Sequence, residues 1–300
     1  MRDVIFIVGP TAIGKSDTAY FLAKKINARI ISCDSMLVYK EPKVISGRPD
    51  QRVLKEVRHY FVGELSIRRE YNVFDYQRKV AALTGRLCWR RIPVIVCGGS
   101  GLYVKALLDG IFAGPGRDPA LRRKLEQKGV DDLYAQLLKL DPETAATIDR
   151  KNPRRLIRAL EIHYGGNAPI SLKKKHSKGL WGRLPIRIFG LRMQREGLNA
   201  RIDQRVDRMF EQGAVEEVKR LLRSKLSLTA QKMIGIKEIK AYLAGDLSLQ
   251  EAKNEMKKNT RHFAKRQMTW FKADERIEWV DVDGMTAQEV AERIEEKISA

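Results

Sequence analysis

Cysteine is scarce in this 300-residue chain, and its three copies, Cys33, Cys88 and Cys97, are scattered. Their odd number and irregular spacing exclude a disulfide framework and a structural zinc site. Long apolar runs are also missing, so no segment has the length of a membrane span, and no signal peptide precedes the first predicted strand. We therefore expect a cytoplasmic protein without a membrane partner.

Acidic residues are fewer than basic ones. The chain has 37 Asp and Glu and 58 Lys and Arg, which gives a formal net charge of +21 at pH 7. Residues 150–225 hold 20 basic and 7 acidic side chains, whereas the chain from residue 274 onward is acidic. Many of these charges are typical of solvated helix faces. The size of the imbalance nevertheless favours an acidic partner, with RNA or DNA as the first candidate.

The most informative stretch is the first strand and the turn after it. Residues 4–8 (VIFIV) predict a buried strand, and Gly9–Ser16 (GPTAIGKS) match the phosphate-binding loop G-x-x-x-x-G-K-[ST]. Apolar residues at helical spacing over 17–27 predict a helix directly after the loop, as the motif requires. We expect this loop to bind a phosphate chain through Gly9, Pro10, Thr11, Ala12, Ile13, Gly14, Lys15 and Ser16.

Each part of the loop has a physical role in that prediction. Gly9 and Gly14 allow a tight turn that points backbone N–H groups inward, and the helix N-terminus adds partial positive charge. Lys15 supplies a cation, and Ser16 supplies a hydroxyl suited to Mg²⁺. The loop predicts that a phosphate chain binds, but not what happens to it.

Two further turns follow predicted strands, and such turns meet at the ligand-binding edge of a parallel sheet. The strand over 28–32 ends at Cys33-Asp34-Ser35, and the strand over 92–97 runs into Gly98-Gly99-Ser100-Gly101. Asp34 is either a functional carboxylate or the cap of the next turn. Ser100 offers a hydroxyl beside glycines that allow close approach of a ligand.

The order of elements predicts an α/β fold, with a P-loop NTPase-like parallel sheet flanked by helices. This core spans 1–113 and 185–300, and an all-helical lobe is inserted at 114–184, where strand-like runs stop. Within the lobe, residues 165–183 predict a mobile basic loop. Other predicted helices lie at 74–90, 102–108, 118–128, 130–140, 153–164, 198–212, 214–223, 235–243, 248–271 and 285–298, and other strands at 58–62, 185–191 and 279–282.

Two basic clusters stand out. Arg154 and Arg158 are i,i+4 neighbours on one face of a predicted helix. Residues 265–272 (KRQMTWFK) interleave cations with aromatics, a mixture that suits a nucleic-acid strand. The same pattern is typical of a helix that packs Trp270 and Phe271 into a core, so it leaves both interpretations open.

Taken together, six blocks in this order resemble the tRNA isopentenyl transferase family, the tRNA dimethylallyltransferases. They are the phosphate loop, 34–39 (DSMLVY), 98–103 (GGSGLY), 141–161 with its NPRRLIRALE, 234–238 (IGIKE) and 260–271. The resemblance covers nearly the whole chain. It implies transfer of a dimethylallyl group from dimethylallyl diphosphate to N6 of adenine 37 in the tRNA anticodon loop, with flipping of that base and release of diphosphate.

The resemblance also implies residue roles, with Asp34, Lys15 and Ser100 as the catalytic residues. Asp34 takes the proton of the adenine amine, while Lys15, the loop and a Mg²⁺ held partly by Ser16 stabilise charge on the leaving diphosphate. Ser100 replaces the usual threonine and keeps the hydroxyl. The implied contacts to the tRNA anticodon stem-loop are Asp34, Ser35, Met36, Leu37, Ser100, Arg122, Arg154, Arg155, Leu156, Ile157, Arg158, Lys232, Lys237, Lys265, Arg266, Gln267, Trp270 and Lys272. We expect a monomer.

The chain departs from the family pattern in four places. Ser16 replaces a threonine, Ile13 a small residue, Arg154 a glutamine, and Glu41–Gly47 (EPKVISG) a stretch that is usually different. These departures concern details of substrate contact and leave the reaction class unchanged.

Three other functions share parts of this pattern. A P-loop small-molecule or nucleotide kinase, or an adenylate isopentenyltransferase acting on a free nucleotide, would need neither the basic lobe nor the 265–272 block. A non-catalytic RNA-binding protein would not need Lys15, Ser16 and Asp34 together. In addition, no acidic residue directly follows the strand over 92–97, which favours a cradle for a leaving group over a nucleotide-hydrolysing site.

Overall fold

The computed structural model describes residues 4–116, 118–166, 169–175 and 178–299, and the side chains of 173–175 also lie outside the description. The chain divides into two compact units. The core unit comprises residues 1–108 and 181–300, and the helical lobe comprises residues 109–180. Both junctions lie a few residues earlier than composition predicts.

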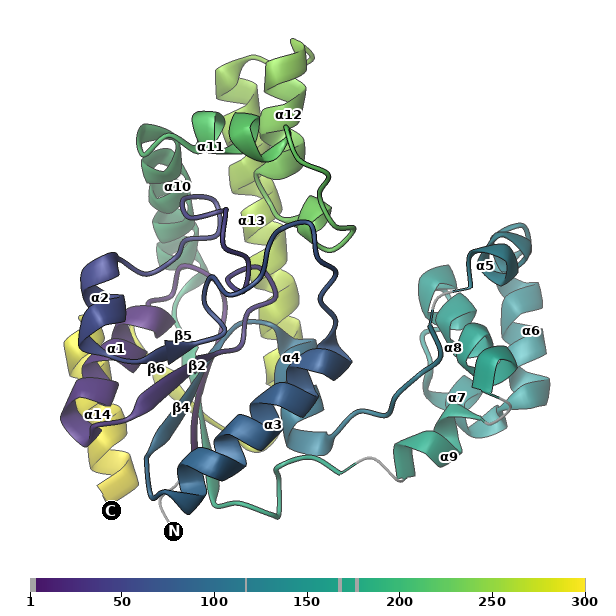
Figure 1. Ribbon diagram of the computed structural model, residues 1–300, viewed down its shortest axis with the longest axis horizontal. Helices are drawn as coiled ribbons and strands as arrows, with labels where there is room; N and C mark the ends of the chain where they lie inside the picture. The colour runs from purple at the N-terminus through teal and green to yellow at the C-terminus, as the bar shows by residue number, and fades with distance from the viewer. Residues whose placement is uncertain (1–3, 117, 167–168, 176–177, 300) are drawn as a thin grey trace. The chain divides into compact units, whose positions relative to one another are not determined.

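A six-stranded parallel sheet forms the centre of the core unit (Figure 1). Its strand order is β3-β2-β4-β1-β5-β6, so the first strand lies inside the sheet and the chain extends it on both sides. The carboxyl ends of β1, β2 and β4 consequently meet at one edge, where ligands bind in such sheets. The strands are β1 (Val4–Val8), β2 (Arg29–Ser32), β3 (His59–Tyr60), β4 (Val94–Gly98), β5 (Ile186–Arg192) and β6 (Ile277–Asp281).

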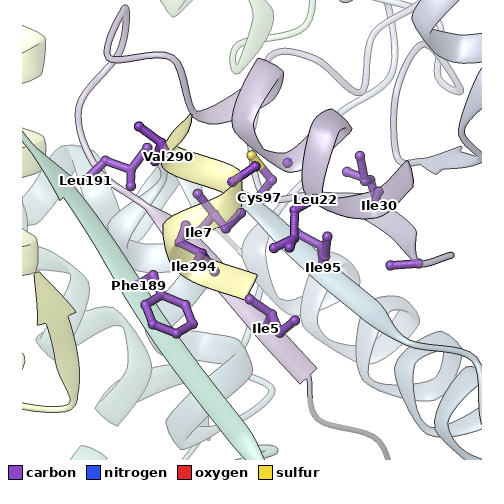
Figure 2. Packing of buried hydrophobic residues seen from close by; sticks show 14 of the residues in the cluster. Ile5, Ile7, Leu22, Ile30, Ile95, Cys97, Phe189, Leu191, Val290 and Ile294 are labelled. Atoms are coloured by element: carbon purple, nitrogen blue, oxygen red, sulfur yellow. The ribbon is translucent and has the colours of Figure 1, made fainter. Parts of the chain in front are cut away.

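Register explains why β1 is apolar at every position. Val4 pairs with Val94 of β4 on one side and Ile186 of β5 on the other, and every residue of β1 is buried. A parallel strand with helices on both faces has no solvated side, so its sequence shows no alternation. Figure 2 shows one of these faces, where Ile5 and Ile7 pack toward apolar side chains of two helices.

Helices account for most of the remaining core unit. The predicted helices over 74–90 and 248–271 are confirmed, with each end differing by one residue. A short helix, α2, falls in a stretch for which none was predicted. The helices are α1 (Lys15–Ile26), α2 (Gln51–Glu56), α3 (Val73–Trp89), α4 (Gly101–Asp109), α10 (Arg195–Glu211), α11 (Ala214–Leu221), η1 (Ala230–Lys232), α12 (Ile236–Ala244), α13 (Leu249–Lys272) and α14 (Ala287–Ser299).

The helical lobe has its own core, formed by side chains such as Leu133, Leu137 and Leu160. Asp118 caps α5 and is followed by a proline, whose fixed φ and missing N–H suit the first helical position. The predicted loop over 165–183 instead contains the helix α9, too short to show a helical period, and its residues 167–168 and 176–177 lie outside the description. The lobe helices are α5 (Pro119–Glu126), α6 (Val130–Leu140), α7 (Pro142–Thr147), α8 (Pro153–Gly166) and α9 (Ile170–Lys175).

No helix in the described ranges combines the length and apolarity of a membrane span.

Candidate active site

The phosphate loop joins β1 to α1 at the carboxyl edge of the sheet, and sterics determine both of its glycines. Gly9 has φ +144°, and a Cβ there would lie 2.7 Å from the carbonyl oxygen of Leu191 in β5. Gly14 has φ +102°, a conformation that L side chains rarely adopt. The neighbouring strand β5 therefore leaves no room for a side chain at Gly9, where the loop begins. The end of the loop, at Gly14, needs left-handed backbone.

Lys15 lies inside this loop. Its Nζ donates a hydrogen bond of 2.5 Å to the carbonyl oxygen of Pro10. Burial lowers the pKa of Lys15 to about 8; the charges of Cys97 and Asp34 oppose that effect, and that of Arg205 adds to it. The amine is thus a desolvated cation in the cradle, which an anionic ligand would stabilise.

A cavity of about 710 Å³, here called the cationic cavity, opens beside the loop. Gly14, Lys15 and Ser16 line one side of it. Residues 43–50 and the helix α10 line the rest, and α10 adds Arg201, Arg205 and Arg208.

Those three arginines have i, i+4 and i+7 spacing, so one face of α10 presents them together. Arg201 also donates to the carbonyl oxygen of Ile13 in the phosphate loop, at 3.4 Å. This cluster is not among the residues predicted from the sequence, although its helical spacing could have indicated it.

Arg205 is held in place by the stretch that departs from the family pattern. A Cβ on Gly47, at φ +62°, would lie 1.8 Å from Nη2 of Arg205, so only glycine leaves room for the guanidinium. The preceding turn is fixed by Glu217 of α11, which is only 4% exposed. Its carboxylate accepts hydrogen bonds of 2.7–3.0 Å from the backbone N–H groups of Lys43, Val44 and Ile45.

A second cavity, of about 350 Å³, is more apolar and is here called the apolar cavity. Asp34 and Ser35 are among its polar lining residues, Met36 is one of its apolar ones, and Arg205 and Met209 line both cavities. Two neighbouring spaces, one cationic and one apolar, suit a ligand that carries phosphates at one end and a hydrocarbon group at the other. Its apolar lining is Ile45, Val206, Met209, Met233, Ile234, Met256 and Phe263.

Asp34 serves as a turn cap and also faces the apolar cavity, so the two interpretations of this residue are compatible. Its Oδ1 accepts hydrogen bonds from the N–H groups of Met36 at 2.8 Å and Leu37 at 3.3 Å. Its Oδ2 accepts no hydrogen bond from the part of the chain that the structure describes. Ser100 Oγ accepts a hydrogen bond from Ser35 N–H at 3.3 Å, which joins the glycine-rich turn to the Asp-Ser turn.

Gln267 of α13 joins the phosphate loop to the glycine-rich turn. Its Oε1 accepts a hydrogen bond from Thr11 N–H at 2.8 Å, and its Nε2 donates to the carbonyl oxygen of Gly99 at 2.9 Å. The side chain is 5% exposed, and a Cβ on Gly99 would lie 2.1 Å from Nε2. Thr11 N–H therefore has an acceptor within the protein, unlike the inward-pointing N–H groups that the sequence predicts for this loop.

Three of the residues expected to contact tRNA have buried side chains. Leu156 and Ile157 pack in the core of the helical lobe, and Gln267 is engaged as described above, so none of these side chains is presented at the surface. The 265–272 block divides, since Phe271 is buried whereas Trp270 is 40% exposed and covers Gly101.

The other expected contacts of the core unit are distributed around its cavities. Lys232 and Arg266 line the apolar cavity. Lys265 and Lys272 line a separate cavity of about 490 Å³ beside α10 and α13.

In the helical lobe, two expected contacts share one carboxylate. Glu161 is 2% exposed and lies 3.3 Å from Nε of Arg122 and 3.5 Å from Nη1 of Arg158. Nε of Arg122 also lies 3.8 Å from a second carboxylate, that of Glu126, so this cluster joins two cations to two anions. Arg154 and Arg155 are exposed on the same helix, α8.

Comparison with known proteins shows extended similarity. A family model described as IPP transferase matches residues 37–274. The tRNA dimethylallyltransferase of Carboxydothermus hydrogenoformans is 41% identical over 304 residues, which cover 98% of this chain and 96% of that protein. The tRNA dimethylallyltransferase of Natranaerobius thermophilus is 37% identical over 302 residues, covering 98% and 90%.

Solved structures give the same result. The full-length tRNA isopentenylpyrophosphate transferase of Bacillus halodurans has a TM-score of 0.72 and 33% identity, covering 100% of this chain and 97% of that one. A eukaryotic dimethylallyltransferase, captured acting on tRNA, has a TM-score of 0.83 and 26% identity, covering 100% and 80%. The P-loop NTPase-like fold predicted from the sequence is confirmed.

Proposed function

This chain belongs to the IPP transferase family, and from that premise we propose that it transfers a dimethylallyl group from dimethylallyl diphosphate to N6 of adenine 37 in tRNA, releasing diphosphate. The single observation that supports this function best is the pair of adjoining cavities. Arg205 borders both, with phosphate-binding groups on one side and Asp34 with an apolar wall on the other.

The diphosphate is assigned to the cationic cavity. Negative charge grows on the leaving group as the allylic C–O bond breaks. Lys15, Arg205 and Arg201 supply fixed positive charge there, in a space partly withdrawn from water. Such preorganised charge stabilises the transition state more than the ground state.

The apolar cavity receives the dimethylallyl group and the flipped adenine. Attack of the N6 amine on the allylic carbon forms the new C–N bond, and the nitrogen then carries a proton that must leave. Asp34 is the proposed base, since its Oδ2 is free of hydrogen bonds within the described residues while Oδ1 is held by the turn. Ser100 keeps the Asp-Ser turn in place through Ser35.

A Mg²⁺ ion fits this site as a partner of the diphosphate. No group of three or more His, Cys, Asp and Glu side chains in the described ranges could hold a metal without other ligands. Ser16 and Asp17 both line the cationic cavity, and Mg²⁺ typically takes one or two protein oxygens together with phosphates and water. When bound, the ion would neutralise charge on the phosphate oxygens.

The tRNA partner is supported by charge. The net charge of +21 exceeds what a small-molecule kinase or a free-nucleotide prenyltransferase needs, and the exposed arginines of α8 are part of that charge. Of the expected contacts, those with accessible side chains remain proposed tRNA-binding residues, including Arg154, Arg155 and Lys265.

Incubation with radiolabelled dimethylallyl diphosphate and an unmodified tRNA transcript, followed by nucleoside analysis, tests the proposal. We expect label in N6-dimethylallyladenosine from tRNA. Label on free AMP alone would indicate an adenylate isopentenyltransferase, and phosphate release from ATP without prenyl transfer would indicate a kinase.

A further inference from the structure

A basic groove of about 1,110 Å³ lies where α11 ends and α12 begins, outside both cavities of the active site. It is here called the outer groove. One glutamate, Glu70, is its only acidic lining residue. Its cationic lining residues are Arg68, Arg223, Lys225, Lys237 and Lys240.

Among the residues that the structure describes, the cations of the outer groove have no carboxylate partners. All five are exposed, and none forms an ion pair within the described part of the chain. Elsewhere the core unit does pair its cations, as in Lys257 with Asp207 and Arg261 with Asp203, both at 2.7 Å. A cluster of like charges without counter-ions costs electrostatic free energy, which an anionic ligand recovers.

The wall of the groove is an ordered loop. Glu70 holds this loop, because Oε1 accepts a hydrogen bond from Leu228 N–H at 2.5 Å and Oε2 one from Thr229 Oγ1 at 3.0 Å, and its single negative charge offsets only one of the five positive charges. Arg68 Nη2 donates to Ser224 Oγ at 3.1 Å. Ser227 N–H donates to the carbonyl oxygen of Ile67 at 2.9 Å. The loop over 222–231 is thus fixed against residues 67–70.

The outer groove and the apolar cavity are lined by neighbouring residues of one short segment. Lys232, Met233 and Ile234 line the apolar cavity with Asp34, whereas Gln231 and Ile236 line the outer groove. The groove therefore lies near the apolar cavity, within reach of an RNA strand whose adenine enters that cavity.

We infer that the outer groove binds backbone phosphates of the RNA substrate next to the nucleotide that is modified. This inference rests on the proposed function. Several separated cations along an open groove suit a polyanionic strand better than a single phosphate, which needs converging donors. The exposed side chain of Leu228, 57% accessible, offers an apolar surface to a sugar or base.

The test compares two double variants with equal loss of charge. Arg223→Gln with Lys225→Gln removes two groove cations. Arg78→Gln with Arg86→Gln removes two exposed cations of α3, which lie outside every cavity described above. For each protein, the Kd of an unmodified tRNA transcript is measured across a salt series, together with kcat at saturating tRNA and the KM for dimethylallyl diphosphate.

Each phosphate contact contributes about 0.7–0.9 to the slope of log K against log salt, so the groove variant should lose about 1.4–1.8 of slope and bind about 30-fold more weakly at 0.1 M salt. Its kcat and its KM for dimethylallyl diphosphate should equal those of the wild type, as should all values of the α3 variant. A groove variant that matches the α3 variant, or that loses affinity at an unchanged slope, would overturn the inference. A wild-type protein that binds tRNA but transfers no prenyl group would instead refute the proposed function.

Discussion

Replacing Gln267 by methionine removes a connection that the tertiary structure places at the centre of the site. Methionine has nearly the same length and can neither accept from Thr11 N–H nor donate to the Gly99 carbonyl. Leaving a buried polar group without its partner costs about 1–3 kcal/mol. The loss of both hydrogen bonds should therefore lower the free energy of unfolding by about 2–6 kcal/mol. Part of this loss should appear as disorder of the phosphate loop.

The consequence for catalysis should be selective. If reordering the phosphate loop takes about 1.4–2.8 kcal/mol from the free energy of binding, the KM for dimethylallyl diphosphate rises about 10- to 100-fold. The tRNA Kd should stay within about twofold, because the side chain is buried and makes no surface contact. Steady-state kinetics with each substrate varied, and calorimetric titration with inorganic diphosphate without tRNA, measure the two effects separately.

Two further variants sharpen this test. Gln267→Glu keeps the acceptor for Thr11 N–H but places a negative charge beside the cradle and opposes the Gly99 carbonyl, so it should not rescue diphosphate binding. Lys265→Gln, an exposed neighbour on α13, should weaken tRNA binding alone. The reasoning is refuted if Gln267→Met binds inorganic diphosphate normally while its tRNA Kd rises many-fold, since that result would make Gln267 a direct tRNA contact. A thermal unfolding scan confirms that each variant is folded at the assay temperature.

Three other predictions concern the same site. Asp34→Ala should lower kcat by about 10²–10⁴ with tRNA binding retained, and near-normal turnover would exclude Asp34 as the base. Gly47→Ala should displace the Arg205 guanidinium and weaken inorganic diphosphate binding about as much as Arg205→Gln does; an unaffected Gly47→Ala would show that this contact is dispensable. Because the pKa of Lys15 is lowered to about 8 and an anion raises it, diphosphate binding should take up protons near pH 8–9 and weaken as pH rises through that range. Calorimetry in two buffers of different ionisation enthalpy measures that uptake relative to Lys15→Arg, which should lack the Lys15 component; equal proton uptake in both proteins would exclude Lys15 as its source.

Glu217 and Gln267 illustrate why much of the site could not be predicted from the sequence. In the sequence, Glu217 is typical of a solvated acidic residue on an amphipathic helix. In the structure, its carboxylate holds a turn more than 170 residues away in the chain. Gln267 lies between cations in a stretch with two plausible faces, and only the packing of α13 decides which face is buried. The burial of Leu156 and Ile157 likewise could not be predicted, because their positions in a family motif carry no information about exposure.

The sequence by itself determined the elements whose physics is local. A run of five apolar residues, the glycine spacing of the phosphate loop and the 3.6-residue periods of the long helices depend on neighbours in the chain, so the fold class and the phosphate site could be predicted. Only the tertiary structure decided which distant groups complete that site, because the arginines of α10, the Glu217 turn and the Gln267 bridge to Thr11 join segments up to 256 residues apart. Their positions follow from how the helices pack on the sheet, and that packing has no short-range signature.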